Sequence, residues 1–166
     1  MSGSLFNRTN IISGTACALF YFISRIICGN GFDMLHKLSE FDILPPIWIF
    51  NAIFLIFYFI IGIAAGAMIH GVSLQQIRGE GETCAYRGGL FFISSFFLGI
   101  IWFPLFFIFQ SLFFSVLCAL SALMCALVCA FQWYKTVNKS SPTLMATFAV
   151  WMFYILFLSI SAAVRF

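Results

Sequence analysis

The chain has 166 residues, of which 63% are hydrophobic and 8% are charged, whereas charged residues make up about a quarter of an average soluble domain. This composition excludes a soluble globular domain, and a net charge of only +3, divided among several polar stretches, argues against a nucleic-acid partner. We therefore expect a single all-α, polytopic membrane domain over residues 1–166.

The first apolar run, Ile11–Cys28, resembles a signal peptide, but no small-x-small cleavage site closes it and Arg25 interrupts its far end. We predict a retained membrane-spanning helix over about residues 9–29, with Arg25 reaching the lipid headgroups from its last turns. The following stretch, 30–45, mixes charges with apolar residues at helical spacing. We interpret it as an interfacial loop or short helix that caps the bundle.

The second predicted helix, residues 46–70, is uncharged and long enough to cross a hydrocarbon core of roughly 30 Å. Phe50, Phe54 and Tyr58 recur every four residues, which predicts an aromatic face, although the same rings could instead face lipid. Gly62 and Gly66 form a Gly-x-x-x-Gly pair that permits close backbone contact. The contacting element would be either a neighbouring helix or a partner chain in a homodimer.

No charged residue occurs from Gly88 to Tyr134, so this run is predicted to fold as two helices, 88–109 and 112–134, joined by a turn at Gln110–Ser111. The polar stretch before it, residues 71–89, is predicted as a loop. The fourth helix carries a stripe of small residues suited to close packing: Ser115, Ala119, Ala122 and Ala126. A fifth helix is predicted over about residues 143–164.

Five spans place the two termini on opposite sides of the membrane, and basic residues indicate which side is which. Five basic residues fall on the N-terminal side and three on the other, which predicts a cytoplasmic N-terminus. The first group is Arg8, Arg78, Arg87, Lys135 and Lys139; the second is Arg25, Lys37 and Arg165.

Residues that could carry chemistry are sparse. The six cysteines include no Cys-x-x-Cys pair, and the two histidines, His36 and His70, are distant in sequence, so no metal site is expected. The spans hold no carboxylate pair or Ser-His set, so we assign no catalytic residue and no cofactor. Three function classes stay open: a binding protein, a small transporter or channel subunit, and a structural or assembly protein of the membrane.

Five spans, a double proline before the second helix and aromatic residues in three helices resemble the translocator protein family, the tryptophan-rich sensory proteins (TspO/MBR). Phe54 replaces a tryptophan of the family pattern, and Gly99 stands where an asparagine is expected. In the fifth helix the family pattern is not matched at Thr147, Phe148 and Ser159. The positions that agree are Pro45, Pro46, Phe50, Tyr58, Gly62 and Ala64 in the second helix, Trp102, Phe106 and Phe107 in the third, and Leu144, Met145, Trp151 and Leu158 in the fifth.

The resemblance implies a five-helix bundle, often dimeric, whose pocket beneath the first loop accepts porphyrins, sterols or isoquinoline-type ligands. The expected ligand is a porphyrin, with Arg25 or Lys37 available to a propionate. The residues expected to bind it are Phe50, Phe54, Tyr58, Trp102, Phe106, Trp151 and Leu158. The membrane would be the plasma membrane of a bacterium or the outer mitochondrial membrane of a eukaryote.

Two departures limit the expected activity. Light-driven porphyrin degradation in some relatives is attributed to a tryptophan at the position of Phe54, and phenylalanine is far harder to oxidise. We therefore expect binding without efficient degradation. The family's sterol-recognition pattern needs a tyrosine near the C-terminus, and none occurs between Leu158 and Arg165, so sterol binding through that pattern is not expected.

Overall fold

The computed structural model describes residues 7–27, 47–74, 79–136 and 139–165, which are entirely helical apart from short turns. Within these residues, five helices are long and apolar enough to cross a membrane, which confirms the predicted all-α membrane bundle. The predicted capping loop, residues 30–45, lies outside the described residues. The elements are α1 (Arg8–Ile27), α3 (Ile47–Ser73), α4 (Glu80–Phe103), η1 (Pro104–Ile108), α5 (Leu112–Tyr134) and α6 (Ser140–Arg165).

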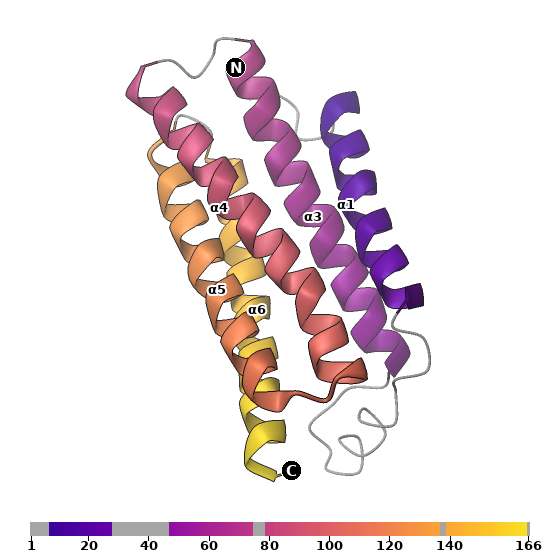
Figure 1. Cartoon of the computed structure of the whole chain (residues 1–166). Coiled ribbons are helices and arrows are strands. Elements are labelled where there is room, and N and C mark those ends of the chain that lie inside the picture. The colour runs from indigo at the N-terminus through magenta and orange to yellow at the C-terminus, as the bar shows by residue number, and fades with distance from the viewer. Residues whose placement is uncertain (1–6, 28–46, 75–78, 137–138, 166) are drawn as a thin grey trace.

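The helices pack chiefly against their neighbours in the chain. α3 packs along α1 on one side and on α6 on the other, whereas α5 packs along both α4 and α6. α3 and α4 contact each other over only a short part of their length, and their ribbons diverge toward the end at which α1 begins, here called the amino end (Figure 1). α6 ends at the opposite end of the bundle.

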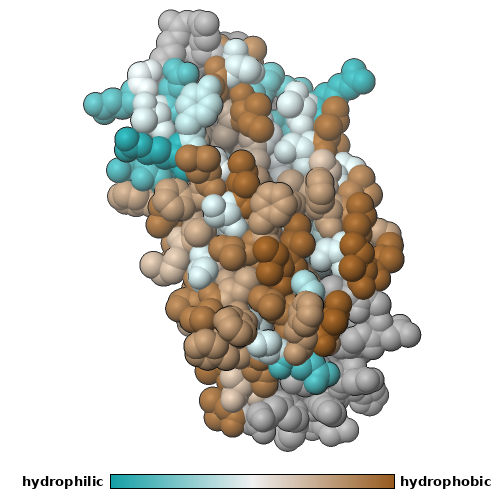
Figure 2. Space-filling model, viewed as in Figure 1, coloured by the Kyte–Doolittle hydropathy of each residue, from teal (hydrophilic) through white to brown (hydrophobic). Residues whose placement is uncertain are grey.

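The outer surface of the bundle is apolar along most of its length. Hydrophobic side chains cover the middle of the face shown in Figure 2, and hydrophilic ones gather toward the amino end. Exposed side chains such as Ile56, Phe97 and Phe153 would be unfavourable in water but contact acyl chains in a bilayer. The chain is therefore an integral, multi-pass membrane protein.

Close packing of α1 against α3 depends on three glycines. A Cβ atom built on Gly62 would lie 2.6 Å from the Cα atom of Gly14 and 2.6 Å from the carbonyl oxygen of Ser13, so the two backbones touch directly. Gly66 likewise meets the Cα atom of Asn10 at 2.8 Å. The Gly-x-x-x-Gly pair therefore contacts a helix of the same chain.

The small-residue stripe of the fourth predicted helix is confirmed, since Ser115, Ala119, Ala122 and Ala126 are all fully buried in α5. Ser95 of α4 donates a hydrogen bond from its hydroxyl to the carbonyl oxygen of Ala122, at 2.9 Å. Small side chains on α5 thus let the two helices approach closely enough for side chain to bond to backbone.

The prediction of a loop over residues 71–89 was wrong for most of its length. α3 continues to Ser73, and α4 begins at Glu80, eight residues before the predicted start at Gly88. The carboxylates of Glu80 and Glu82 lie in the first turn of α4, where the helix dipole favours negative charge. The polar residues from Glu80 onward therefore belong to α4, because a polar segment can form helical hydrogen bonds as well as an apolar one.

The predicted helix 88–109 also changes geometry at its end. Pro104 has no N–H to donate to the carbonyl four residues earlier, and Pro104–Ile108 forms a wider π-helical turn, closed by the Phe109 N–H on the Pro104 carbonyl oxygen at 3.0 Å. Phe106 and Phe107 are both buried as a result. Gln110 then has φ +49°, and the predicted turn at Gln110–Ser111 is confirmed.

Candidate functional site

The residues predicted to bind a ligand lie in the half of the bundle away from the amino end. Each is buried, with an exposed fraction of 9% for Trp151 and 1% or less for the others. They come from three segments of the chain: Phe50, Phe54 and Tyr58 from α3, Trp102 and Phe106 from α4 and η1, and Trp151 and Leu158 from α6. We call the six rings of this set, together with Tyr21, Phe57 and Phe103, the aromatic cluster.

Phe54 is the centre of the aromatic cluster. Its ring centroid lies 4.9 Å from that of Phe50, 5.1 Å from that of Trp151 and 6.2 Å from that of Trp102. Trp102 in turn stacks on Phe106 at 4.8 Å. Rings from α3, α4, η1 and α6 therefore meet at one place, while Leu158 is buried in the same hydrophobic core.

Three members of the aromatic cluster were missed in the sequence. Tyr21 of α1 stacks on Phe54 at 5.6 Å and on Tyr58 at 5.3 Å. Phe103 lies 4.7 Å from Phe54, and Phe57 stacks on Trp151 at 5.2 Å. Tyr21 could have been found from its spacing of seven residues after Gly14, which places both on one helix face.

The two tryptophans of the aromatic cluster differ in their hydrogen bonding. The indole N–H of Trp102 donates to the Ser159 hydroxyl at 2.9 Å, and that hydroxyl donates to the Ile155 carbonyl oxygen at 2.9 Å. Within the part of the chain that the structure describes, no group accepts the buried N–H of Trp151. A buried donor without an acceptor is unfavourable, so Trp151 holds an unused hydrogen-bonding capacity.

Tyr58 carries a second buried polar atom, its hydroxyl, for which the described residues supply no hydrogen-bond partner. This hydroxyl lies against Gly99 of α4, since a Cβ atom built on Gly99 would be 2.5 Å from it. The asparagine of the family pattern would not fit at position 99 unless Tyr58 moved. Glycine at 99 and the inward position of the Tyr58 ring are therefore coupled.

A polar contact joins α1 to α3 beside the aromatic cluster. The Arg25 Nε donates to the Asn51 side-chain oxygen at 3.2 Å, and the Tyr21 hydroxyl donates to the same oxygen at 3.3 Å. Arg25 is thus half-buried against a neighbouring helix, a contact that neither of its predicted roles, at the lipid headgroups or at a propionate, included. Asn51 was missed, although a lone amide inside an apolar span is a recognisable feature. Lys37 lies outside the described residues.

Among the described residues, the site offers stacked apolar rings, a cation near one edge and two buried groups without a hydrogen-bond partner, the Trp151 indole N–H and the Tyr58 hydroxyl. A flat ligand with polar substituents matches these groups in kind. The model of the TspO/MBR family matches residues 12–165 of the chain. A comparison of the chain with curated proteins found no match.

Proposed function

Because the chain belongs to the TspO/MBR family and is a membrane-bound binding or sensory protein, we propose that its ligand is a flat tetrapyrrole of the porphyrin class. The ligand binds inside the bundle at the aromatic cluster. The observation that carries the proposal is the buried indole N–H of Trp151, which has no acceptor among the described residues although stacked rings surround it.

A porphyrin supplies what these residues lack. Its faces stack on aromatic rings, and its propionate oxygens accept hydrogen bonds from an indole N–H. Trp151 is the most exposed of the seven predicted site residues, at 9%, and stacks on the half-buried ring of Phe57, so it lies at the outer side of the aromatic cluster. Arg25 adds positive charge next to Tyr21 of the aromatic cluster, since both side chains donate to the Asn51 oxygen. These features support a ligand that is flat, apolar and anionic at its rim.

We expect Trp151→Phe to weaken porphyrin binding in the dark about tenfold, the loss of one hydrogen bond from a buried donor to a charged acceptor. Trp102→Phe should change the affinity much less, because the Trp102 N–H already donates to Ser159 inside the bundle. The measurement is a titration of the detergent-purified protein with protoporphyrin, followed by the absorbance of the porphyrin itself.

Trp48→Phe is the control, since Trp48 is 72% exposed on the outer surface and lies outside the aromatic cluster. An unsaturable signal that grows linearly, as for partition into micelles, would contradict the proposal. Equal affinities for wild type and Trp151→Phe would mean that Trp151 does not bind the porphyrin, although the porphyrin would still be a ligand of the protein.

Bound porphyrin should survive illumination. Phe54 is enclosed by the Phe50, Phe103 and Trp151 rings, and its benzene ring is a poor electron donor to an excited porphyrin. The porphyrin absorbance of the complex should therefore fall under visible light no faster than that of the same porphyrin in empty micelles. A rapid, protein-dependent loss would show that another residue, with Trp102 and Trp151 as the nearest indoles, supports the photochemistry.

A further inference from the structure

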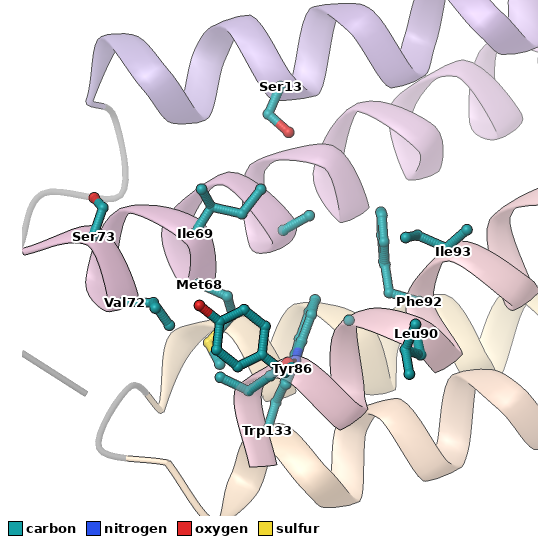
Figure 3. A pocket seen from close by; sticks show the side chains of 13 residues that line it. Ser13, Met68, Ile69, Val72, Ser73, Tyr86, Leu90, Phe92, Ile93 and Trp133 are labelled. Atoms are coloured by element: carbon teal, nitrogen blue, oxygen red, sulfur yellow. Dashed lines mark hydrogen bonds between the residues drawn. The ribbon is translucent and has the colours of Figure 1, made fainter. Parts of the chain in front are cut away.

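A cavity of about 530 Å³ lies between α3 and α4 near the amino end, a volume within the range of about 300–1,000 Å³ typical of small-molecule sites. We call it the α3–α4 groove. Its walls come from four helices, with Ser13 from α1, Ile69 from α3, Leu90 from α4 and Trp133 from α5 among them (Figure 3). It forms where α3 and α4 diverge.

The groove is separate from the aromatic cluster. Phe96 stands between the two: its ring lies 6.2 Å from that of Phe92, which lines the groove, and 5.5 Å from that of Tyr58. Phe20 of α1 contacts the same ring at 6.1 Å. A ligand of the groove therefore leaves the porphyrin site unoccupied.

The mouth of the groove opens toward the bilayer. Ile69, Leu90 and Ile93 line it and are 63%, 69% and 51% exposed, which places their apolar surfaces against acyl chains in a membrane-spanning chain. The groove is thus continuous with the lipid-contact surface of the protein. Acyl chains of the surrounding lipid can therefore reach the groove without crossing water.

Two of the three hydroxyl groups that line the groove lie toward one end of it, and the third is that of Ser13 on α1. The hydroxyls of Ser73 and Tyr86 lie toward the end at which α3 stops, whereas Phe92 and Ile93 lie deeper in the bundle (Figure 3). A tyrosine near the membrane boundary is typical of the headgroup level. An acyl chain entering from the amino end would have its ester groups beside the hydroxyls and its methylenes beside the apolar walls.

The charge at the amino end favours an anionic headgroup. Among the described residues there, four are basic and two are acidic, and each basic side chain near the membrane surface attracts anionic lipid. Arg8 begins α1, and Arg87 directly follows Tyr86. The six residues are Arg8, Arg87, Lys135, Lys139, Glu80 and Glu82.

We propose that the α3–α4 groove is a lipid-binding site that holds one acyl chain of an anionic phospholipid, with the phosphate at the amino end. Trp133 fixes the inner wall, because its indole N–H donates to the Ala85 carbonyl oxygen at 3.2 Å and its ring covers Gly88. The wall is therefore preorganised, which reduces the cost of ordering it around a chain. The site is independent of the proposed porphyrin function.

Gly89 provides the test. It lines the groove, and a Cβ atom built on it meets nothing within 4 Å, so Gly89→Leu fills the groove without backbone conflict. The protein is reconstituted with equal amounts of palmitoyl-oleoyl phosphatidylglycerol and phosphatidylcholine, returned to detergent and washed. Lipid retained per chain is counted by native mass spectrometry. Wild type should retain about one phosphatidylglycerol, as expected for one cavity of this size, and Gly89→Leu several-fold less.

The control adds the same side chain elsewhere on the surface: Ala146→Leu on exposed Ala146 of α6 should retain lipid as wild type does. Ile93→Phe is a second groove-filling variant and carries the test if Gly89→Leu does not fold. Porphyrin affinity should be unchanged in both groove variants. Equal retention by all four proteins, or retention by none, would overturn the proposal. If phosphatidylcholine were retained as well as phosphatidylglycerol, the site would not select an anionic headgroup.

Discussion

Replacing Gly62 by leucine is expected to lower the free energy of unfolding by about 3 kcal/mol or more, the upper part of the range for overpacked sites. The atoms that the new side chain meets first belong to the backbone of α1, with Ser13 O and Gly14 Cα each at 2.6 Å from the added Cβ. A backbone cannot rotate out of the way as a side chain can. α1 must therefore move off α3, and the contacts along their shared face weaken together.

Gly89→Leu is the matched control, because it makes the same chemical change in a helix but meets open space. Both variants gain the same helix propensity, so their difference isolates the effect of close packing. Unfolding is followed by far-ultraviolet circular dichroism in detergent during heating. Similar transition midpoints for the two variants would contradict a direct backbone contact between α1 and α3.

Replacing Trp102 by alanine should cost about 3–5 kcal/mol of stability, the usual effect of removing a buried large aromatic side chain. Trp102 is fully buried and contacts the Phe54, Phe106 and Phe107 rings. The cavity left by the substitution cannot be filled by a ring from one helix alone, because the surrounding rings come from α3 and from both sides of Pro104. The hydrogen bond from the Trp102 indole N–H to the Ser159 hydroxyl is lost as well.

Trp48→Ala removes the same number of atoms from a side chain that is 72% exposed to lipid, and we expect its effect to be within about 0.5 kcal/mol, as for most surface substitutions. The same thermal measurement compares the two variants, and Trp102→Phe separates ring packing from the indole N–H. A Trp102→Ala protein as stable as Trp48→Ala would mean that the aromatic cluster does not support the bundle.

The fold could be predicted because its cause is local. An apolar run long enough to cross a bilayer must satisfy its backbone hydrogen bonds internally, so the five spans followed from hydropathy alone. Helix ends were less predictable, as at Glu80. Hydropathy marks only the part of a helix that lies in lipid, whereas the helix itself continues beyond the lipid into water. The π-helical turn after Pro104 was missed for a related reason: a proline predicts a disturbed helix without specifying which wider or tighter turn replaces it.

The aromatic cluster could be predicted in part. The repeat of Phe50, Phe54 and Tyr58 placed three rings on one face of α3, since that depends only on helix geometry. The contact between Tyr21 and Asn51 could not be predicted, because it depends on how closely α1 approaches α3. The α3–α4 groove had no sequence counterpart at all: it arises from the divergence of two helices, and residues such as Ile69 and Leu90 look like ordinary lipid-facing side chains.

The neighbour-to-neighbour packing of the helices bears on how the protein is made. α1 contacts mainly α3, and α5 contacts both α4 and α6, so most partners are synthesised one after the other. Chains with such local contacts assemble quickly and in order from the N-terminus. The α1–α3 pair, joined through Gly14 and Gly62, can therefore form in the membrane before the ribosome has completed α4. The contact between α3 and α6 joins this pair to the other helices of the bundle.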